Sequence, residues 1–155
     1  MLRVNIEVVD SLEEDEIVIR CKKLDNTVQK VHQAIMKEIS ATPKLTFYKK
    51  NEAYYFLPEK VLFFETDNDC VYAHTANDVF RIRFRLYELE EMLPGQFVRI
   101  SKSAIINMQH IFAIDRNLTS ASLVRFQESH KQVYVSRFYY KNLREKLKER
   151  VQYEY

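Results

Sequence analysis

The sequence predicts a mainly β fold, with short strands across residues 44–155 and a small α+β extension in residues 1–43. Short apolar runs follow one another closely after residue 44, which is typical of antiparallel strands joined by tight turns. The chain holds ten Phe and ten Tyr, and aromatic residues favour strands. It has a single glycine, Gly95, and short segments with Asn and Asp stand where turns are needed.

Residues 1–43 are expected to form two strands and a helix. Apolar and polar residues alternate in LRVNIEVVD, which places Val4, Ile6 and Val8 on one face of a strand. The acidic segment SLEEDE is expected to be a turn, and EIVIRC a second strand. A helix then begins with Asn26 as its cap and ends before the next proline. Its apolar residues recur at helical spacing: Val28, Val31, Ile35 and Ile39.

The pattern from residue 44 onward predicts a series of strands and two helices. KLTFYK and EAYYFL flank Lys50-Asn51 as a hairpin, and KVLFFE, CVYAHT and VFRIRF are further strands. A short helix follows in RLYELEEML and ends at Pro94. The strands FVRI, HIFAID, SLVRF and QVYV precede a last helix, capped by Ser136. That helix has an apolar stripe and a basic face: Tyr140, Leu143, Leu147 and Val151 against Lys141, Arg144, Lys146, Lys148 and Arg150.

Charge is distributed unevenly along the chain, although its net value is only +2. Residues 1–95 hold 13 Lys and Arg against 17 Asp and Glu, a balance of −4, and residues 96–155 hold 11 against 5, a balance of +6. A basic C-terminal part suits a polyanionic partner such as nucleic acid, but a solvated helix face explains the same charge equally well. With a single glycine, the glycine-rich phosphate loops of the common nucleotide-binding enzymes are excluded.

No group of residues in the sequence points to catalysis or to a bound metal. The four histidines have no metal-ligand spacing and no nucleophile motif beside them. Cys21 and Cys70 have no CxxC pairing and are expected to be buried free thiols. Glu65 and Asp67 resemble an acid–base pair, but a strand end followed by a turn explains them better. We therefore expect no enzyme activity, no catalytic residue, no metal and no cofactor.

The segment FVRISKSAIINMQHIFAID combines cations and hydroxyls with a branched apolar run. Its polar residues are Arg99, Ser101, Lys102 and Ser103. Side chains of these types and helix N-terminal amides bind phosphate oxygens, and Arg is the usual reader of guanine edges. Arg137 begins the last helix and has the same potential. Taken alone, however, the segment is equally well explained as the polar end of a strand.

Four segments, in order, resemble the LytTR DNA-binding domain family. They are VLFFETDND, RLYELEEML, PGQFVRISKSAIINMQHIFAID and QVYVSRFYYKNLREKL, and they cover about residues 45–149. The resemblance implies stacked antiparallel sheets of short strands with two short helices. It also implies a bacterial transcription regulator that reads successive major grooves of double-stranded DNA through loops.

The resemblance further implies three groups of DNA-contacting residues. They are a turn with Asn68 and Asp69, a segment with Ser101, Lys102 and Ser103, and a helix start with Arg137, Phe138 and Tyr139. Lys102 and Ser103 are expected to anchor phosphate. Arg137 is expected to read a base, and Arg99 to support the strand end. Phe138 stands where the family often has a second basic residue.

The resemblance is to the stand-alone regulators of this family, because residues 1–43 are too few for the receiver domain of a response regulator. It implies a cytoplasmic protein that pairs as a homodimer on repeated promoter half-sites and takes no small-molecule substrate. Control by a small membrane protein encoded alongside is a hypothesis, and the helix from Asn26 to Ile39 is expected to serve core or dimer packing. Two other functions stay open, a protein-interaction module and a binder of single-stranded nucleic acid or RNA.

Overall fold

The computed structural model describes residues 2–39 and 43–152, and side-chain surroundings are described for residues 2–39 and 43–149. The chain divides into two compact units, Met1–Ala41 and Thr42–Tyr155. Within the described residues, the first unit has a single helix, and every strand belongs to the second.

The first unit consists of helix α1, Asn26–Ile39, and a preceding segment that forms neither helix nor strand. The strands predicted in LRVNIEVVD and EIVIRC are therefore absent from residues 2–25, because a strand needs a hydrogen-bonding neighbour and none is formed here. The prediction of the helix is confirmed, but its cap differs. The Val28 amide donates to Asp25 Oδ1 at 3.0 Å, so Asp25 rather than Asn26 caps the helix.

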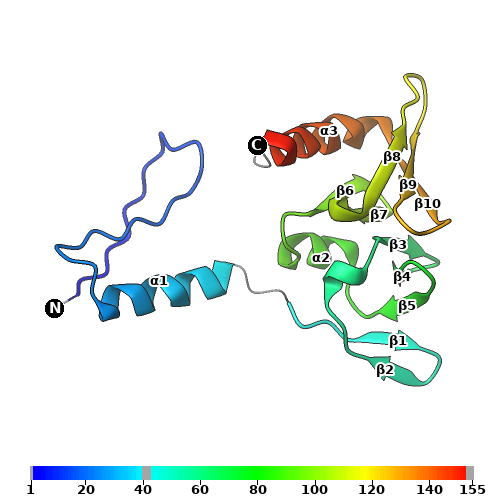
Figure 1. Cartoon of the computed structure of the whole chain (residues 1–155). Coiled ribbons are helices and arrows are strands. Elements are labelled where there is room, and N and C mark those ends of the chain that lie inside the picture. Colours follow the sequence, from blue (N-terminus) through cyan, green and yellow to red (C-terminus); the bar gives the residue numbers. More distant parts are fainter. Residues whose placement is uncertain (1, 40–42, 153–155) are drawn as a thin grey trace. The chain divides into compact units, whose positions relative to one another are not determined.

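The second unit contains two antiparallel sheets (Figure 1). The larger has seven strands in the order β2-β1-β5-β4-β3-β7-β6, and the smaller has three in the order β10-β9-β8. In Figure 1 the larger sheet runs from the β1–β2 hairpin at the bottom to β6, which lies near helix α3. The strands are β1 Phe47–Lys49, β2 Glu52–Tyr54, β3 Phe63–Asp67, β4 Cys70–His74, β5 Val79–Ile82, β6 Phe97–Ser101, β7 Ala104–Asn107, β8 Ile111–Asp115, β9 Ser122–Phe126 and β10 Gln132–Val135.

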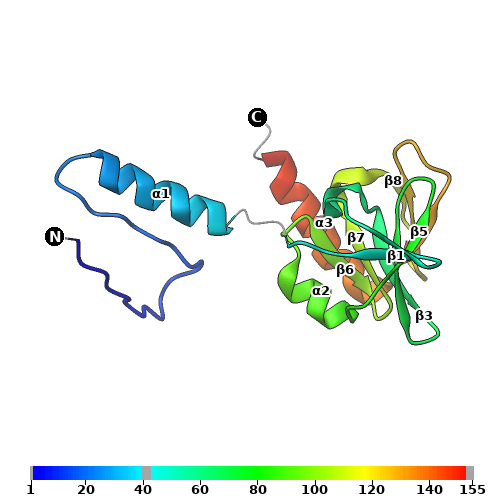
Figure 2. The ribbon, with the colours of Figure 1, turned by 90° about the horizontal axis from the view of Figure 1, so that it is seen from below.

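Two α-helices and two single-turn 3-10 helices accompany these strands. Helix α2, Leu86–Met92, connects β5 to β6, and α3, Arg137–Gln152, follows β10. The 3-10 helices are Pro58–Lys60 and Met108–His110. Figure 2 shows the strands of both sheets gathered beside α2 and α3. The prediction of one short helix before β6 and one helix at the end is confirmed.

Within the larger sheet, β7 and the first half of β3 are buried on both faces, whereas β5 alternates exposed and buried residues. Phe63 and Phe64 are neighbours on β3 and point to opposite faces, as successive strand residues do. Phe64 joins a core with Leu86 and Leu89 of α2, whereas Phe63 joins a core with the smaller sheet and Leu143 of α3. Two-sided burial explains why KVLFFE and SAIIN are continuous apolar runs rather than alternating ones. The prediction of stacked antiparallel sheets is confirmed.

Tight turns use residues other than glycine in the left-handed backbone region. Asn68 and Asp69 have φ angles of 47° and 65°, so the β3–β4 turn is built from the residue types that tolerate this region best. In the β1–β2 hairpin the left-handed residue is Lys50, with a φ of 56°, and not Asn51. The hairpin itself was predicted correctly, but the residue that carries its turn geometry was not.

Candidate nucleic-acid interface

The three segments predicted to contact DNA lie side by side at one edge of the second unit. The Thr66 amide, near the end of β3, donates to the Ser103 carbonyl at 2.8 Å and so joins the β3–β4 turn to the β6–β7 turn. The Ser136 amide donates to the Ile100 carbonyl at 2.9 Å and joins the start of α3 to the end of β6. Segments far apart in the sequence therefore form one continuous edge.

Arg99 holds the β6–β7 turn from the inside. Its Nε donates to the Ser101 carbonyl at 2.7 Å, and its Nη2 donates to the Lys102 carbonyl at 2.5 Å. Its Nη1 donates to Glu90 Oε2, on α2, at 2.9 Å. Only 17% of the Arg99 side chain is exposed. The guanidinium therefore fixes the shape of the turn, and its donors point at protein rather than at solvent.

The turn presents Lys102 outward between two serines. Ser101 Oγ accepts a hydrogen bond from the Ser103 amide at 3.1 Å and lies 3.3 Å from Ser103 Oγ. Lys102 and Ser103 are exposed, and Ser101 is partly exposed. Because Arg99 and Ser101 fix the backbone here, the Lys102 side chain starts from a rigid base.

The start of α3 adds an exposed cation and an exposed aromatic ring. Arg137 is exposed, and 85% of Phe138 is exposed. Tyr139 differs, because it is partly buried and packs against the core that contains Leu143. The rings of Phe138 and Tyr139 meet edge to face, with centroids 5.1 Å apart. Of the three residues predicted at this helix start, two are therefore open to a ligand and one supports them.

Helix α3 begins directly after Ser136, but the predicted cap is made differently. The Ser136 carbonyl accepts the Tyr140 amide at 3.1 Å, whereas its hydroxyl is buried and makes no hydrogen bond with the described residues. Further along α3, the basic face remains in contact with solvent. Its exposed or partly exposed cations are Lys141, Arg144, Lys146 and Lys148.

The β3–β4 turn contributes polar but acidic groups to the same edge. Asp67, Asn68 and Asp69 are all exposed. Carboxylates can accept a hydrogen bond from the cytosine amino group but repel phosphate. The edge is therefore basic at the β6–β7 turn and along α3, and acidic at the β3–β4 turn.

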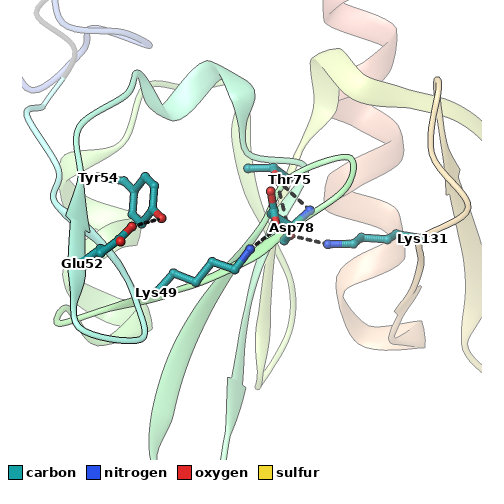
Figure 3. Close-up of polar contacts among 6 residues, drawn as sticks. All are labelled: Lys49, Glu52, Tyr54, Thr75, Asp78 and Lys131. Atoms are coloured by element: carbon teal, nitrogen blue, oxygen red, sulfur yellow. Dashed lines mark hydrogen bonds and ion pairs between the residues drawn. The ribbon is translucent and has the colours of Figure 1, made fainter.

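Asp78 joins the two sheets at the other end of β4 (Figure 3). Its carboxylate accepts from Lys49 Nζ of β1, and its carbonyl accepts from Lys131 Nζ, in the β9–β10 hairpin. Its amide donates to Thr75 Oγ1 at 3.2 Å. The hydrogen bond to Asp78 raises the pKa of Lys49, whereas burial lowers the pKa of Lys131. Sequence analysis missed this cluster, because no local pattern brings its three elements together.

His74 and Glu65 form a partly buried pair across β3 and β4. The His74 ring stacks on Phe63, with centroids 4.3 Å apart, and its Nε2 lies 3.1 Å from Glu65 Oε1. Burial, together with the charge of Lys131, lowers the pKa of His74 to about 4. Burial and the charge of Asp67 raise the pKa of Glu65. A neutral imidazole that donates to a carboxylate fits this geometry at pH 7.

Within the residues that the structure describes, no three His, Cys, Asp or Glu side chains are arranged to hold a metal ion. In the same part of the chain, no helix combines the length and the apolar character that a membrane span requires. Cys21 and Cys70 are both free thiols, but Cys21 is exposed and Cys70 is partly exposed, so the prediction that they are buried is wrong.

The fold and its exposed edge define an all-β domain that presents polar loops and a basic helix at one side. The model of the LytTr DNA-binding domain family matches residues 51–148. The chain therefore belongs to the LytTR DNA-binding domain family. The predicted resemblance is confirmed.

Relatives and a solved structure agree with this membership. The chain is 31% identical over 147 residues to an uncharacterized HTH-type transcriptional regulator of Staphylococcus aureus strain NCTC 8325, covering 95% of this chain and 99% of that protein. It is 32% identical over 150 residues to a regulator of the same description from the bovine strain RF122, with the same coverage. A solved LytTr DNA-binding domain from Bacillus cereus superposes with a TM-score of 0.62 at 25% identity, covering 68% of this chain and 97% of that one. Together these findings support a DNA-binding regulator.

The names of these relatives include a helix-turn-helix, but the described residues contain none. No two α-helices are consecutive there, since β1 and β2 follow α1, and strands separate α2 from α3. A recognition helix held against a second helix is therefore not available in this part of the chain.

Proposed function

We propose that the chain is a cytoplasmic bacterial regulator of transcription that binds double-stranded DNA sequence-specifically, with loops in the major groove. It acts as a homodimer on repeated promoter half-sites. The family match lies in residues 51–148, and our candidate for the source of the regulator's signal is a small membrane protein.

The proposal depends above all on the two backbone hydrogen bonds that hold the candidate segments at one edge. They run from Thr66 to Ser103 and from Ser136 to Ile100. A duplex offers phosphates on both sides of each groove, so adjacent cationic segments can contact backbone and bases together. Had Lys102 and Arg137 been buried or on opposite sides of the unit, one duplex could not have reached both.

Each residue at this edge has a distinct proposed role. Lys102 and Ser103 bind phosphate, because both are exposed on a rigid turn. Arg137 is the leading base reader, since Arg is the commonest partner of guanine in the major groove. Arg99 positions the turn and does not contact DNA, because each of its three guanidinium nitrogens already donates to a protein acceptor.

Phe138 gives this chain a readout that a basic residue would not provide. A ring that is 85% exposed on the first turn of a helix costs solubility without stabilising the core. In the major groove, an apolar side chain contacts the methyl group of thymine. Asn68 and Asp69 are left with a minor role, in which Asp69 accepts from a cytosine amino group.

Selection of duplexes from a random pool, at a stated salt concentration, tests the proposal and defines a site for measurement. On that site, Lys102→Ala should weaken binding about equally for all sequences and reduce the salt slope by about 1. Arg137→Ala should cost about 1–3 kcal/mol and relax one base position. Lys50→Ala, an exposed cation in the β1–β2 hairpin, is the matched control and should change neither quantity.

Each alternative function gives a different result. A protein-interaction module gives no selected duplex and no binding at low salt. A binder of single strands or RNA prefers oligonucleotides to duplex, because stacking on its tyrosines needs unpaired bases. Either outcome would overturn the proposal.

A further inference from the structure

The first unit leaves its apolar side chains unburied. Val28 is its single buried hydrophobic residue among those described, whereas the exposed fractions of Val4, Ile6 and Val8 are 95%, 87% and 87%. These three residues lie on one face of the alternating segment LRVNIEV, residues 2–8. An alternating segment with an open backbone and an open apolar face fits a partner that supplies both a strand edge and an apolar surface.

The segment is complementary to itself when two copies run antiparallel about Asn5. In that register, Arg3 of each copy lies opposite Glu7 of the other, and Asn5 lies opposite Asn5. On the other face Leu2 lies opposite Val8, and Val4 lies opposite Ile6. One face of the ribbon therefore carries two ion pairs and no net charge, and the other face is entirely apolar.

This register is the one that pairs the charges. Sliding the partner by two residues keeps the apolar face together, but it moves Arg3 opposite Asn5 or Val9 and separates it from Glu7. Sliding it by one residue places apolar side chains opposite polar ones. The charges and the apolar residues therefore agree on a single alignment of two copies.

We propose that residues 2–8 of two copies of this chain pair as an antiparallel ribbon centred on Asn5, which makes the chain a dimer in the absence of DNA. The ribbon gives the proposed homodimer its contact, but it rests on the first unit alone and stands whether or not the DNA contacts hold. The matches with the relatives extend into this unit, because they cover 95% of the chain.

The first unit also contains what such a ribbon needs to become stable. Two strands alone are marginal in water. They become stable when a further strand pairs with them or a helix packs against their apolar face. Helix α1 carries an apolar stripe with Val31, Ile35 and Ile39, of which Val31 and Ile39 are exposed. In a dimer, two such helices are available to cover the apolar face of one ribbon.

Exchanging the charges at Arg3 and Glu7 tests the pairing directly. The dimerisation of the full chain without DNA is measured by sedimentation equilibrium over a concentration series. Arg3→Glu or Glu7→Arg alone creates two like-charged pairs per dimer, and each should weaken dimerisation by about tenfold or more. The double variant Arg3→Glu/Glu7→Arg restores both attractive pairs and should dimerise as the unchanged chain does. Mixing the two single variants should likewise produce a heterodimer, because each supplies the charge that the other lacks.

Matched controls separate pairing from net charge. Lys23→Glu and Glu13→Arg make the same charge changes outside residues 2–8 and should leave the dimer intact. The proposal is overturned if the unchanged chain is a monomer throughout, as it would be if residues 2–8 paired with 16–21 of the same chain. It is also overturned if the single variants behave as the controls do, or if the mixture forms no heterodimer. DNA binding measured on the same variants is a separate readout, so failure of the ribbon leaves the proposed DNA contacts to be judged alone.

Discussion

Residues 2–8 alternate apolar and polar side chains, and strand β4 alternates partly buried and buried ones, but the two segments have opposite surroundings. In β4, Cys70–His74, Val71 and Ala73 are buried, because β3 and β5 pair with its two edges and a core lies against the face that these two residues share. In residues 2–8 no edge is paired and the apolar side chains are exposed. Alternation therefore indicates which face of a segment would be buried, but the neighbours decide whether a strand forms at all.

The two units also differ in the size of their apolar residues. All ten Phe and all ten Tyr lie after residue 46, and the first unit relies on aliphatic side chains alone. Aromatic rings bury large areas and dominate small cores. The stacked pair Phe47–Phe56 and the pair Phe63–Phe126 show this in the second unit. The second unit can therefore form a core within one chain, whereas the first has little with which to do so.

The largest expected contrast between the units comes from removing one apolar side chain in each. Phe64→Ala empties a fully buried position and should cost about 3–5 kcal/mol of unfolding free energy. Ile6→Ala removes a side chain of the first unit that is 87% exposed, and should change the unfolding free energy of the second unit by less than about 0.5 kcal/mol. Urea unfolding followed by tyrosine fluorescence measures this, since every tyrosine belongs to the second unit. Equal losses would contradict the division into a self-sufficient unit and an open one.

A smaller difference is expected between a histidine of each unit, in how its replacement changes the pH dependence of the unfolding free energy. Burial lowers the pKa of His74 from 6.5 to about 4. Between these two pH values, the unfolded chain therefore binds a proton at this residue and the folded chain does not. Stability is then fully present above pH 6.5 and falls with decreasing pH, by about 2 kcal/mol between pH 7 and pH 5. His74→Gln should remove most of this slope, as measured by urea unfolding at both pH values.

The matched control for this prediction is His32, which lies exposed on α1. His32→Gln makes the same replacement on an exposed helix surface and controls for the loss of an imidazole as such. The raised pKa of Glu65 has the opposite effect, because its contribution to stability is lost as the pH rises through that pKa. Comparing the unchanged chain with His74→Gln isolates the contribution of the imidazole. A His74→Gln variant with the slope of the unchanged chain would show that the imidazole is not buried as described.

The sequence was a good guide to the second unit for a physical reason. Continuous apolar runs such as KVLFFE belong to strands that are buried on both faces, and each run is bounded by turn residues. Helix α1 was predicted for a similar reason, because a helix satisfies its hydrogen bonds within one segment. The strands of residues 2–10 and 16–21 were predicted wrongly, because strand pairing depends on a second segment that the local pattern does not contain.

The family motif named the candidate residues of this edge, but it did not reveal which protein groups hold them in place. The family motif located Lys102 and Arg137, whereas the position of Arg99 inside the turn depends on Glu90, which lies on a different element. The bridge from Lys131 to Asp78 was invisible for the same reason. Contacts between distant segments are set by the packing of the sheets, and no local spacing encodes them.

The smallest expected effect distinguishes a residue that shapes the interface from one that contacts DNA. Arg99→Lys keeps the charge but loses the forked geometry that binds two carbonyls and a carboxylate together. The β6–β7 turn should then loosen, and affinity for a selected duplex should fall by about three- to tenfold, an energy of about 1 kcal/mol. Because Arg99 makes no phosphate contact in this proposal, the salt slope should stay constant, in contrast with Lys102→Ala.

Two further variants make this last prediction decisive. Glu90→Gln removes the ion pair but leaves Arg99 free to hold the carbonyls of Ser101 and Lys102, so its effect should be weaker than that of Arg99→Lys. Arg20→Lys makes the same replacement in the first unit and should leave DNA affinity unchanged, because its side chain is exposed there. If Arg99→Ala lowers the salt slope by about 1, as loss of a phosphate contact would, then Arg99 itself touches the duplex and the inward-facing guanidinium must turn outward on binding.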